Sequence, residues 1–316
     1  MDYIVFDLEW NQCPEGKDME VPELPFEIIE IGAIKLNSER KIVDKFHCLV
    51  RPVVYPKLHF RTKEIVKKTD EELRQGMAFP DAVKGFLEWA GPEAFFCTWG
   101  SVDLIELQRN MKYYGILSLL KGPMHFYDVQ KLFAINYETT KARRSLEYGI
   151  DYLELDKELD FHQALSDAYY TAEVFQTIDW DVVYAYDSID VYQNPRTKEE
   201  EIHAIYNGYS KYISREFASK EEALADREVT STQCCRCEKL ARKKLRWFSV
   251  NAKNYYCVAV CPAHGYMKGK IRMKKTDEGR FFVVKTIKVS SEPEVEDIKK
   301  RKESMIIRRR EKKRNK

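Results

Sequence analysis

The sequence contains no run of eighteen apolar residues, so we expect no membrane-spanning helix. Its first residues carry neither a basic segment nor a small-residue cleavage site, and we therefore predict no signal peptide. Without a secretion signal, the eight cysteines are expected to be thiols or metal ligands in a reducing cytoplasm rather than disulfides. No internal repeat is found along the chain.

The composition suits a soluble globular protein. The chain has 316 residues, enough for one substantial domain and a smaller one. Apolar residues make up 44% of it and charged residues 33%, which allows an ample hydrophobic core.

Charge is distributed unequally along the chain, although the formal net charge is only +2. Residues 1–233 contain 27 Lys and Arg against 42 Asp and Glu, a net charge of −15. Residues 234–316 contain 26 against 9, a net charge of +17. So basic a C-terminal part predicts a polyanionic partner such as nucleic acid. The alternative is a solvated basic face that has no partner.

Strand-like and helix-like patterns alternate over the first 180 residues, which predicts an α/β fold with a mixed sheet. A helix is expected from Pro80 to Trp89, because apolar residues recur there at helical spacing and Gly91 and Pro92 follow. Short apolar runs predict strands at residues 3–6, 28–36, 42–50, 94–99 and 124–127.

The remaining chain is divided by its composition. We predict an α/β domain over residues 1–180, a polar helical linker over 181–228 and a small β-rich basic domain over 229–290. The charged tail over 291–316 is expected to be a solvated helix or a disordered arm.

Two carboxylates close the first predicted strand. Asp7 and Glu9 lie two residues apart, so their side chains point to the same face of a strand and converge. Converging carboxylates repel each other unless a cation lies between them, and Mg²⁺ prefers oxygen ligands of this kind. The pair alone is a weak signal, because an Asp-x-Glu sequence at a strand end is common.

Two further acidic residues lie near the starts of predicted helices. Ser101 is a predicted N-cap, which places Asp103 in the first helical turn, where it could also simply stabilise the helix dipole. Five residues turn about 140° around a helix, so His162 and Asp167 share a site only if His162 lies at or before the helix start. A lone histidine in such a place is more often a surface or capping residue.

Three motifs follow one another along the chain: Asp7-x-Glu9 on the first strand, Asp103 in the first turn of a helix, and His162-x₄-Asp167 at a later helix. Their order and spacing resemble the DEDDh family of 3′-to-5′ exonucleases, which includes ribonuclease T, oligoribonuclease and the proofreading subunit of the bacterial replicative polymerase. The resemblance covers roughly residues 1–180 and implies a ribonuclease H-like fold with a five-stranded mixed sheet. Its flanking blocks are Glu27-Ile-Ile-Glu-Ile-Gly-Ala-Ile, the segment 62–69 with Phe79 and Phe86, Phe96-Cys-Thr-Trp-Gly, and His162-Gln-Ala-Leu-Ser-Asp-Ala.

The resemblance also implies roles for the residues that match. Two Mg²⁺ or Mn²⁺ ions would be bound by Asp7, Glu9, Asp103 and Asp167, with Asp7 the best candidate to bridge them. One ion would lower the pKa of a bound water, and the other would stabilise the leaving 3′-oxygen. His162 would be the general base, since an unperturbed imidazole pKa near 6.5 suits proton transfer at neutral pH.

The implied substrate is single-stranded nucleic acid, cut to nucleoside 5′-monophosphates. The first block, which carries Asp7 and Glu9, and the Thr-Trp-Gly block at residues 98–100 look closer to RNA-processing members of the family. This similarity favours RNA over DNA as the substrate. Trp10 stands where many relatives carry a small residue or Thr. Its ring either stacks on the terminal base or fills core space.

Five of the eight cysteines lie between residues 234 and 261. Cys234 and Cys237 form one pair, Cys261 and His264 form a second, and the residues between them suit a β-hairpin. Thiolates and imidazole are the ligands of a tetrahedral structural Zn²⁺, so this module resembles a zinc ribbon. A redox role is the lesser alternative, because no strand-to-helix pattern surrounds the cysteines. Either of the other two cysteines could replace one of the four ligands, namely Cys235 or Cys257.

Cations and aromatic residues are interleaved around these cysteines, a composition that suits a platform for single-stranded nucleic acid. We expect the module to hold substrate upstream of its 3′ end while the acidic site removes nucleotides. The expected nucleic-acid contacts are Trp10, Arg242, Lys243, Lys244, Arg246 and Trp247.

Two other functions fit parts of the sequence. A catalytically silent nucleic-acid-binding adaptor is disfavoured because all five catalytic positions are filled. A metal phosphodiesterase acting on mononucleotides is disfavoured by the large basic module. The sequence does not identify protein partners.

Overall fold

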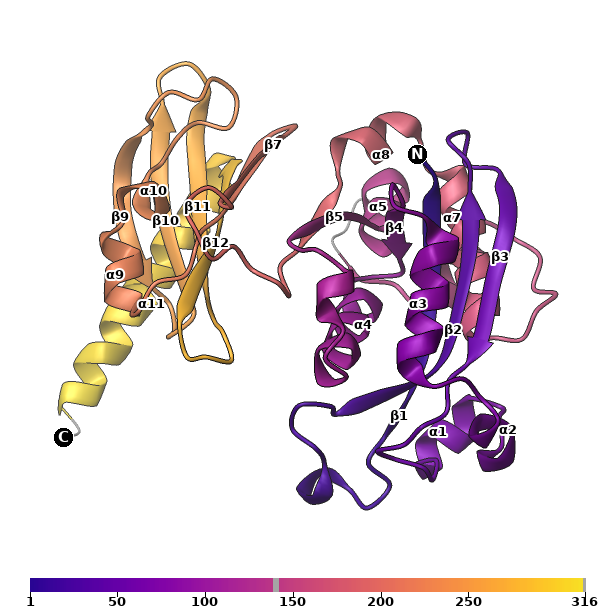
Figure 1. Ribbon diagram of the computed structural model, residues 1–316. Helices are drawn as coiled ribbons and strands as arrows, with labels where there is room; N and C mark the ends of the chain where they lie inside the picture. Colours follow the sequence, from indigo (N-terminus) through magenta and orange to yellow (C-terminus); the bar gives the residue numbers. More distant parts are fainter. Residues whose placement is uncertain (139–141, 315–316) are drawn as a thin grey trace. The chain divides into compact units, whose positions relative to one another are not determined.

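The computed structural model describes residues 1–138 and 142–314. The chain forms two compact units, Met1–Gln193 and Asn194–Lys316 (Figure 1). The first unit extends beyond residue 180, where the sequence places the end of the α/β domain. The reason is that a short strand, β6 (Ser188–Asp190), pairs with the sheet of the first unit.

The first unit is built on a mixed sheet with strand order β3-β2-β1-β4-β5-β6. Three neighbouring strands on one side are antiparallel, β1, β4 and β5 run parallel, and β6 is antiparallel to β5. With helices on both faces, this confirms the ribonuclease H-like α/β fold, with six strands in place of five. The other strands are β1 (Tyr3–Gln12), β2 (Phe26–Leu36), β3 (Ile42–Leu49), β4 (Phe95–Thr98) and β5 (Met124–Asp128).

The helices of the first unit occupy the connections between these strands. Helix α3 starts one residue before the predicted Pro80 and ends at Ala90, so the prediction of this helix is confirmed. The α-helices are α1 (Phe60–Ile65), α2 (Asp70–Arg74), α3 (Phe79–Ala90), α4 (Val102–Tyr113), α5 (Val129–Tyr137), α6 (Leu146–Tyr152), α7 (Ala164–Thr177) and α8 (Trp180–Ala185), and two short 3₁₀ helices are η1 (Lys17–Met19) and η2 (Leu117–Leu119).

Alternate residues of β1 face opposite sides of the sheet and belong to two separate hydrophobic cores. Phe6 and Leu8 pack in one core with residues of α3 and α4. Tyr3 and Val5 pack in the other with residues of α5 and α7. Burial of one such side chain stabilises the folded chain by about 1.5–3 kcal/mol. Because the side chains alternate, Asp7 lies on the face that α7 covers.

Helix α7 approaches the sheet closely at Gly32 of β2. A Cβ atom at this position would lie 2.1 Å from the backbone nitrogen of Leu165 and 2.2 Å from the carbonyl carbon of Ala164. Gly32 is also directly opposite Asp7 in the β1–β2 pairing. The missing side chain therefore allows the first turn of α7 to lie against the strand that carries the acidic pair.

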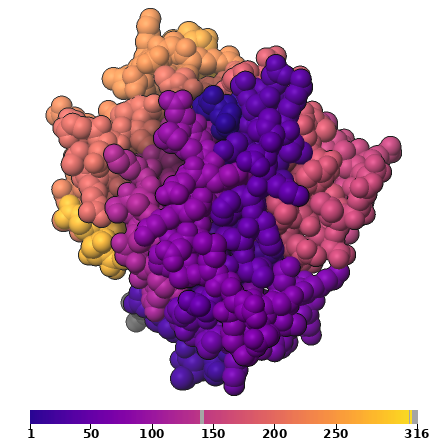
Figure 2. Space-filling model, turned by 45° about the vertical axis from the view of Figure 1, so that its right-hand side comes forward, coloured from indigo at the N-terminus to yellow at the C-terminus, as the bar shows by residue number. Residues whose placement is uncertain are grey.

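The segment that follows Glu9 is held at one end of the first unit, where residues 13–25 gather with α1 and α2 (Figure 2). The Tyr55 hydroxyl donates to the Leu24 carbonyl and accepts from the Val21 N–H, both at 2.9 Å. The Asn11 side chain accepts from the His59 N–H at 2.9 Å and donates to two backbone carbonyls. These bonds anchor the end of β1 that lies beyond the acidic pair.

The second unit contains a six-stranded antiparallel sheet with strand order β7-β8-β12-β11-β10-β9. One face is buried by Ile271, Met273 and Val283 packing against residues of the short helices α9 (Lys220–Ala225) and α10 (Arg227–Thr230). The β-rich character expected for this part is confirmed. The strands are β7 (Ile202–Tyr206), β8 (Tyr209–Ile213), β9 (Arg242–Ser249), β10 (Asn254–Cys261), β11 (Gly265–Lys275) and β12 (Phe281–Val289).

The segment 181–228, expected to be a helical linker, contains strands as well as short helices, and most of it belongs to the second unit. Strands β7 and β8 form a hairpin around Asn207 and Gly208, and Gly208 has a φ of +87°. An Asn-Gly pair between strands is a strong hairpin signal, and here Gly208 takes the positive φ of the turn whereas Asn207 does not. The many charged residues around the hairpin hide the period-two pattern of its short strands.

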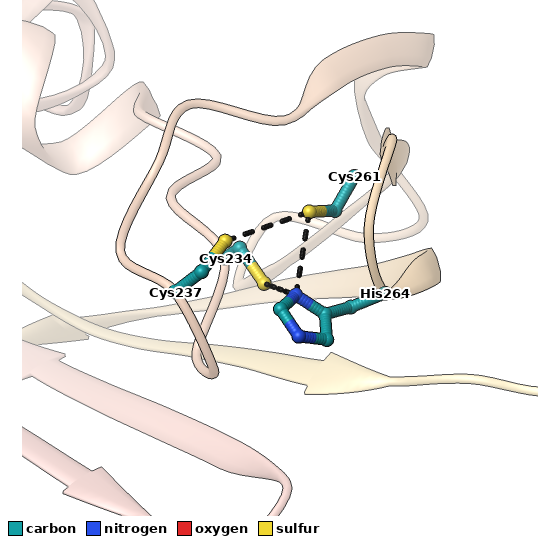
Figure 3. Close-up of side chains that lie close together, drawn as sticks. All are labelled: Cys234, Cys237, Cys261 and His264. Atoms are coloured by element: carbon teal, nitrogen blue, oxygen red, sulfur yellow. Dashed lines mark hydrogen bonds between the residues drawn. The ribbon is translucent and has the colours of Figure 1, made fainter.

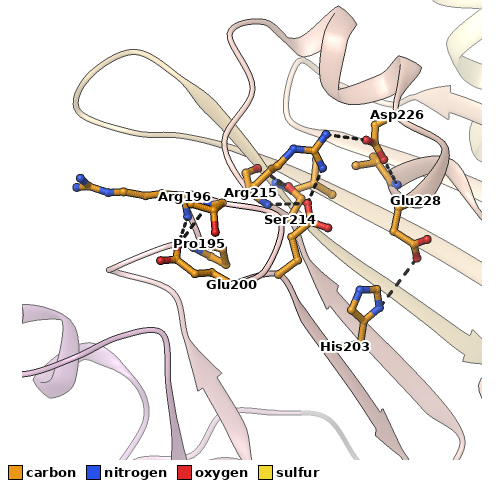
Figure 4. A network of polar contacts seen from close by, with 12 residues as sticks. Pro195, Arg196, Glu200, His203, Ser214, Arg215, Asp226 and Glu228 are labelled. Atoms are coloured by element: carbon orange, nitrogen blue, oxygen red, sulfur yellow. Dashed lines mark hydrogen bonds and ion pairs between the residues drawn. The ribbon is translucent and has the colours of Figure 1, made fainter.

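An ionic network connects this hairpin to α10 (Figure 4). The Arg215 guanidinium donates to Glu201 at 2.8 Å and to Asp226 at 3.1 Å. Asp226 also accepts from the Val229 N–H at 3.0 Å and so caps α10. The network therefore ties the segments on both sides of the hairpin to the helix behind the sheet.

The tail expected as a solvated helix or a disordered arm is helix α11 (Glu292–Arg314). Val295 and Ile298 are buried and pack against Val258 of β10, on the sheet face opposite α9 and α10. Farther along, Ile306 and Ile307 are exposed. Among the residues described, no helix combines the length and apolar composition required to cross a lipid bilayer.

Replacing Gly32 by Ala is expected to destabilise the first unit strongly, because the new methyl group would overlap the backbone of α7. Overpacking of this kind costs about 1–3 kcal/mol or more. Urea unfolding of the full chain measures the loss. The matched control is Gly85→Ala on α3, where a Cβ meets nothing within 4 Å, and where stability should stay constant or rise by up to about 1 kcal/mol. Equal stability of the two variants would contradict the close approach of α7.

Candidate active site and metal centres

Asp7 and Glu9 project from β1 towards the side of the sheet covered by α7. In the β1–β2 pairing, Asp7 is opposite Gly32 and Glu9 is opposite Glu30. The strand register shifts between Glu9 and Trp10, which marks a bulge directly after the acidic pair. A bulge bends a strand and redirects its side chains. The convergence of Asp7 and Glu9 on one face, predicted from their spacing, is present.

Asp103 reaches the same place from the first turn of α4. Ser101 is the N-cap of this helix as predicted, although its side chain makes no capping hydrogen bond. Asp103 is only 6% exposed. Its carboxylate accepts hydrogen bonds from its own backbone N–H and from that of Leu8 on β1.

His162 lies before the start of α7, as the site requires. Gln163 is the N-cap and Asp167 lies in the first turn. The His162 backbone N–H donates to Asp167 Oδ2 at 3.2 Å, and His162 itself has a φ of +64°. Positive φ is uncommon for residues other than glycine and is concentrated at functional sites. Potential ligand atoms of Glu9, His162 and Asp167 lie within 4.8 Å of one another.

Burial and mutual repulsion raise the pKa values of the four carboxyl groups, with burial the largest cause for each. The pKa of Asp7 is raised well above its ordinary value, and Asp103 and Glu9 add to the shift. The pKa of Glu9 is raised to about 8, with further contributions from Asp167 and Glu30. The pKa of Asp103 is raised to about 7 and that of Asp167 to about 6, against opposing hydrogen bonds.

A fifth carboxylate, which the sequence analysis did not identify as part of the site, belongs to the same cluster. Glu30 is 1% exposed and is one of the charges that raise the pKa values of Asp7, Glu9 and Asp167. Its Oε1 atom lies 2.7 Å from Nε2 of His47 on β3. The signal in the sequence is an acidic residue within the apolar stretch of residues 28–34, where a carboxylate is costly unless it has a partner.

The cluster has the properties of a divalent-cation site. Asp167 Oδ1 and Glu30 Oε2 are buried and have no hydrogen-bond partner among the described residues. Oxygen ligands that repel one another and lack donors suit a hard cation such as Mg²⁺ or Mn²⁺. The residues present therefore fit the metal ions that the sequence implied.

A second group of potential metal ligands lies in the second unit. Cys234, Cys237, Cys261 and His264 point their sulfur and nitrogen atoms towards one another (Figure 3). The Cys237 and Cys261 sulfurs are 3.6 Å apart, and His264 Nδ1 lies 3.5 Å from the Cys234 sulfur and 3.6 Å from that of Cys261. Ligands about 2.0–2.3 Å from a tetrahedral Zn²⁺ would be separated by about 3.5–3.8 Å. The separations thus fit a zinc ion.

The other cysteines of this region lie outside the group. Cys235 packs in the core beside it, and Cys257 is fully buried between Gly269 and Trp247. Burial raises the pKa of the Cys257 thiol to about 12. Burial by itself would raise the pKa of the Cys261 thiol. Hydrogen bonds from Ala263 and His264 outweigh this effect and lower the pKa to about 6. Low thiol pKa values favour the thiolate that metals bind.

The expected nucleic-acid contacts occupy different environments. Arg242, Lys243, Lys244 and Arg246 are exposed on β9, which is an edge strand of its sheet. Trp247, in contrast, packs into the interior, and its indole N–H donates to the Thr230 carbonyl at 2.9 Å. Its ring is therefore not presented as an open stacking surface. The reason is the alternation of faces along a strand, which turns Trp247 towards the helices.

Trp10 is partly buried beside the first core. Its ring centroid lies 5.8 Å from that of Phe26, and it packs against the core that contains Phe6 and Leu8. Of the two roles considered for this residue, the packing role is realised in the structure.

Sequence comparison identifies a family match and similar proteins. The pattern of the exonuclease family RNase_T matches residues 4–175. The probable 3′-5′ exonuclease KapD of Bacillus subtilis (strain 168) is 29% identical over 185 residues, which cover 57% of this chain and 86% of KapD. The 3′-5′ exoribonuclease 1 of Mus musculus is 27% identical over 179 residues, which cover 53% of this chain. The chain matches only 50% of that mouse protein's length.

Solved structures with similar chains include the nuclease domain of 3′hExo, described as a DEDDh family member bound to rAMP. It has a TM-score of 0.47 and 24% identity, with 55% of this chain and 90% of that chain covered. The cell-death related nuclease 4 (CRN-4) has a TM-score of 0.46 and 17% identity, with 60% and 65% covered.

Without divalent cations, we expect the first unit to lose stability as the pH rises from about 6 to about 8. The carboxyl pKa values are raised above their unfolded values near 4, so the native state binds more protons than the unfolded state in this window, and stability falls with pH. Calorimetry in EDTA measures this slope. Mn²⁺ should restore more stability at the upper pH, where it competes with fewer protons.

Glu9→Gln is the control, because it removes one titrating group and should flatten the slope. A stability that rises with pH in EDTA would contradict the repulsion among the carboxylates.

Proposed function

We propose a mechanism and a substrate for this chain, which belongs to the exonuclease family RNase_T and is a 3′-to-5′ exonuclease acting on nucleic acid. The proposal rests on one observation above all. Four carboxylates from three separate elements are brought into one buried cluster beside a histidine.

We assign Asp7, Glu9, Asp103 and Asp167 as ligands of two Mg²⁺ or Mn²⁺ ions. When bound, the ions lower the pKa of a coordinated water and neutralise charge on the leaving 3′-oxygen. Asp7 would help to hold both ions, because its carboxylate interacts with all the other carboxylates of the cluster. Glu30 adds a further negative charge next to Glu9.

His162 is the proposed general base. Its backbone N–H is bonded to Asp167, which holds the exposed imidazole at the edge of the carboxylate cluster. The imidazole takes a proton from the attacking water while the water oxygen forms a bond to phosphorus. The bond between phosphorus and the 3′-oxygen of the preceding nucleotide breaks. The released nucleotide therefore keeps its phosphate on the 5′-oxygen, and the product is a nucleoside 5′-monophosphate.

The proposed substrate is single-stranded RNA in preference to DNA. The support comes from the resemblance of the first sequence block to RNA-processing members and from the mouse and rat relatives named exoribonucleases. A catalytically silent adaptor is the alternative function. The complete set of carboxylates and the histidine in one place favours the enzyme.

The second unit is proposed to hold the strand upstream of the site, with one structural Zn²⁺ bound by Cys234, Cys237, Cys261 and His264. Zinc would link the loop before β9 to the turn between β10 and β11 and so stabilise the basic sheet. None of the eight cysteines is paired in a disulfide, which supports a reducing compartment, and the cytoplasm is the proposed location.

Purified protein is expected to shorten 5′-labelled single-stranded RNA stepwise from the 3′ end in Mg²⁺ or Mn²⁺ but not in EDTA. Asp7→Asn should abolish cleavage, and His162→Ala should slow it by about 10²–10⁴-fold because the general base is lost. Asp81→Asn, on the exposed side of α3, is the control that should cut at the wild-type rate. A DNA strand run in parallel tests the sugar preference. Salt-sensitive binding without cleavage would mean that the protein is an adaptor.

Removal of zinc should selectively destabilise the second unit, because the four ligands would join the loop before β9 to the turn between β10 and β11. Cys261→Ser should lower bound zinc, measured by mass spectrometry, and lower the unfolding temperature of the second unit. Cys235→Ser should leave zinc content unchanged, since Cys235 lies outside the ligand group. Dinucleotide hydrolysis should survive in both variants. Zinc-free wild-type protein, or equal zinc loss in both variants, would refute the assignment.

A further inference from the structure

Strand β11 presents a row of cations on one face of the second sheet. Lys268, Lys270, Arg272 and Lys274 alternate with the buried Met267, Gly269, Ile271 and Met273. Residues two apart on a strand are separated by about 6.6–6.8 Å, so the four cations are evenly spaced along a line. All four side chains are partly or fully exposed.

Neighbouring strands increase the positive charge of this row instead of neutralising it. Lys268 is directly opposite Lys288 of β12, and like charges directly opposite each other destabilise a sheet. Neither β11 nor β12 contains an Asp or Glu. Glu294 of α11 lies 3.9 Å from Lys268. Glu294 interacts with both Lys268 and Lys288, so an acidic side chain of α11 lies beside this end of the row, and the two strands themselves contribute only positive charge.

Aromatic rings lie on both sides of the row. On the β10 side, Tyr256 is opposite Lys270, whose Nζ lies 5.9 Å from the ring centroid. Arg301 of α11 lies 5.7 Å from the same ring. On the β8 side, Lys288 is opposite Tyr209, whose ring stacks on that of Tyr206 with centroids 4.5 Å apart.

We propose that this row, defined by Lys268, Lys270, Arg272 and Lys274, is the binding site for the sugar–phosphate backbone of an unpaired nucleic-acid strand. Evenly spaced cations along an extended line match the phosphates of an extended strand, and the flanking rings offer stacking surfaces for unpaired bases. A duplex hides its base faces, so it gains only the charge contribution. The inference rests on the proposed role of the second unit in holding substrate.

The cations of β9 differ from the row in their position. They lie on an edge strand, where charged residues also prevent pairing with another chain. Their ring neighbour Trp247 is turned into the core. Removing one Lys and one Arg from either strand changes the charge equally, so the β9 cations provide a matched comparison within the same sheet.

The test compares two double variants that each remove two cations from the full chain. Lys270→Gln with Arg272→Gln alters the row, and Lys244→Gln with Arg246→Gln alters β9. Binding of a labelled oligouridine of about twenty nucleotides is followed by fluorescence anisotropy at about 50–200 mM salt, without added Mg²⁺ or Mn²⁺ and without a chelator, so that the proposed zinc site keeps its ion. The row variant should bind about tenfold more weakly and reduce the slope of log K against log salt by about 1.4, or about 0.7 for each lost phosphate contact.

The β9 variant should change the affinity several-fold less than the row variant. Lys270→Arg with Arg272→Lys keeps the charge and should bind as wild type, and thermal unfolding with zinc content checks that each variant is folded. Equal or larger losses in the β9 variant, or equal affinity for a duplex and a single strand, would overturn the proposed site. Dinucleotide hydrolysis should not change in any variant. Absence of dinucleotide hydrolysis by the wild-type protein would instead refute the proposed exonuclease. Absence of salt-dependent oligouridine binding by the wild-type protein would refute the proposed role of the second unit in holding substrate.

Discussion

Repulsion among buried carboxylates is the constraint on which the first unit depends. Strand pairing holds Asp7 and Glu9 in place, the first turn of α4 holds Asp103, and α7 holds Asp167. Burial removes the water that would screen these charges, and all four pKa values rise as a result. A cation that binds the native cluster stabilises the folded unit by mass action. Metal binding and the stability of this unit are therefore coupled.

The close approach at Gly32 is what makes this arrangement possible. The helix that carries Asp167 and follows His162 touches the sheet at the residue opposite Asp7. The same approach leaves His162 just outside the helix, in a backbone conformation that few side chains adopt. Geometry of this kind is maintained because packing on both sides of the sheet over-determines it.

The second unit shows a related pattern with the opposite sign of charge. Cations are aligned on β11 and face one another across β12, without acidic residues on either strand. An acidic catalytic centre repels the phosphates of its own substrate unless metal ions intervene. On the proposed function, a separate basic surface would supply affinity that the catalytic unit does not provide, and that affinity would depend on salt. Zinc would contribute by holding the loops at one end of this sheet.

The sequence by itself predicted the four carboxylates with His162, through local spacings combined with the resemblance of their order to the DEDDh family, and it predicted the cysteine–histidine group from two paired motifs. Two residues on a strand share a face, and a Cys-x₂-Cys turn brings two sulfurs together wherever it lies. Only the tertiary structure decided that Glu30 and His47 adjoin the site, that the partly buried Trp247 packs against the core of the second unit and that the charged segment after residue 195 contains a hairpin. These features depend on strand register and on which face a helix covers. Register is set by contacts between residues far apart in the sequence, so local composition does not reveal it.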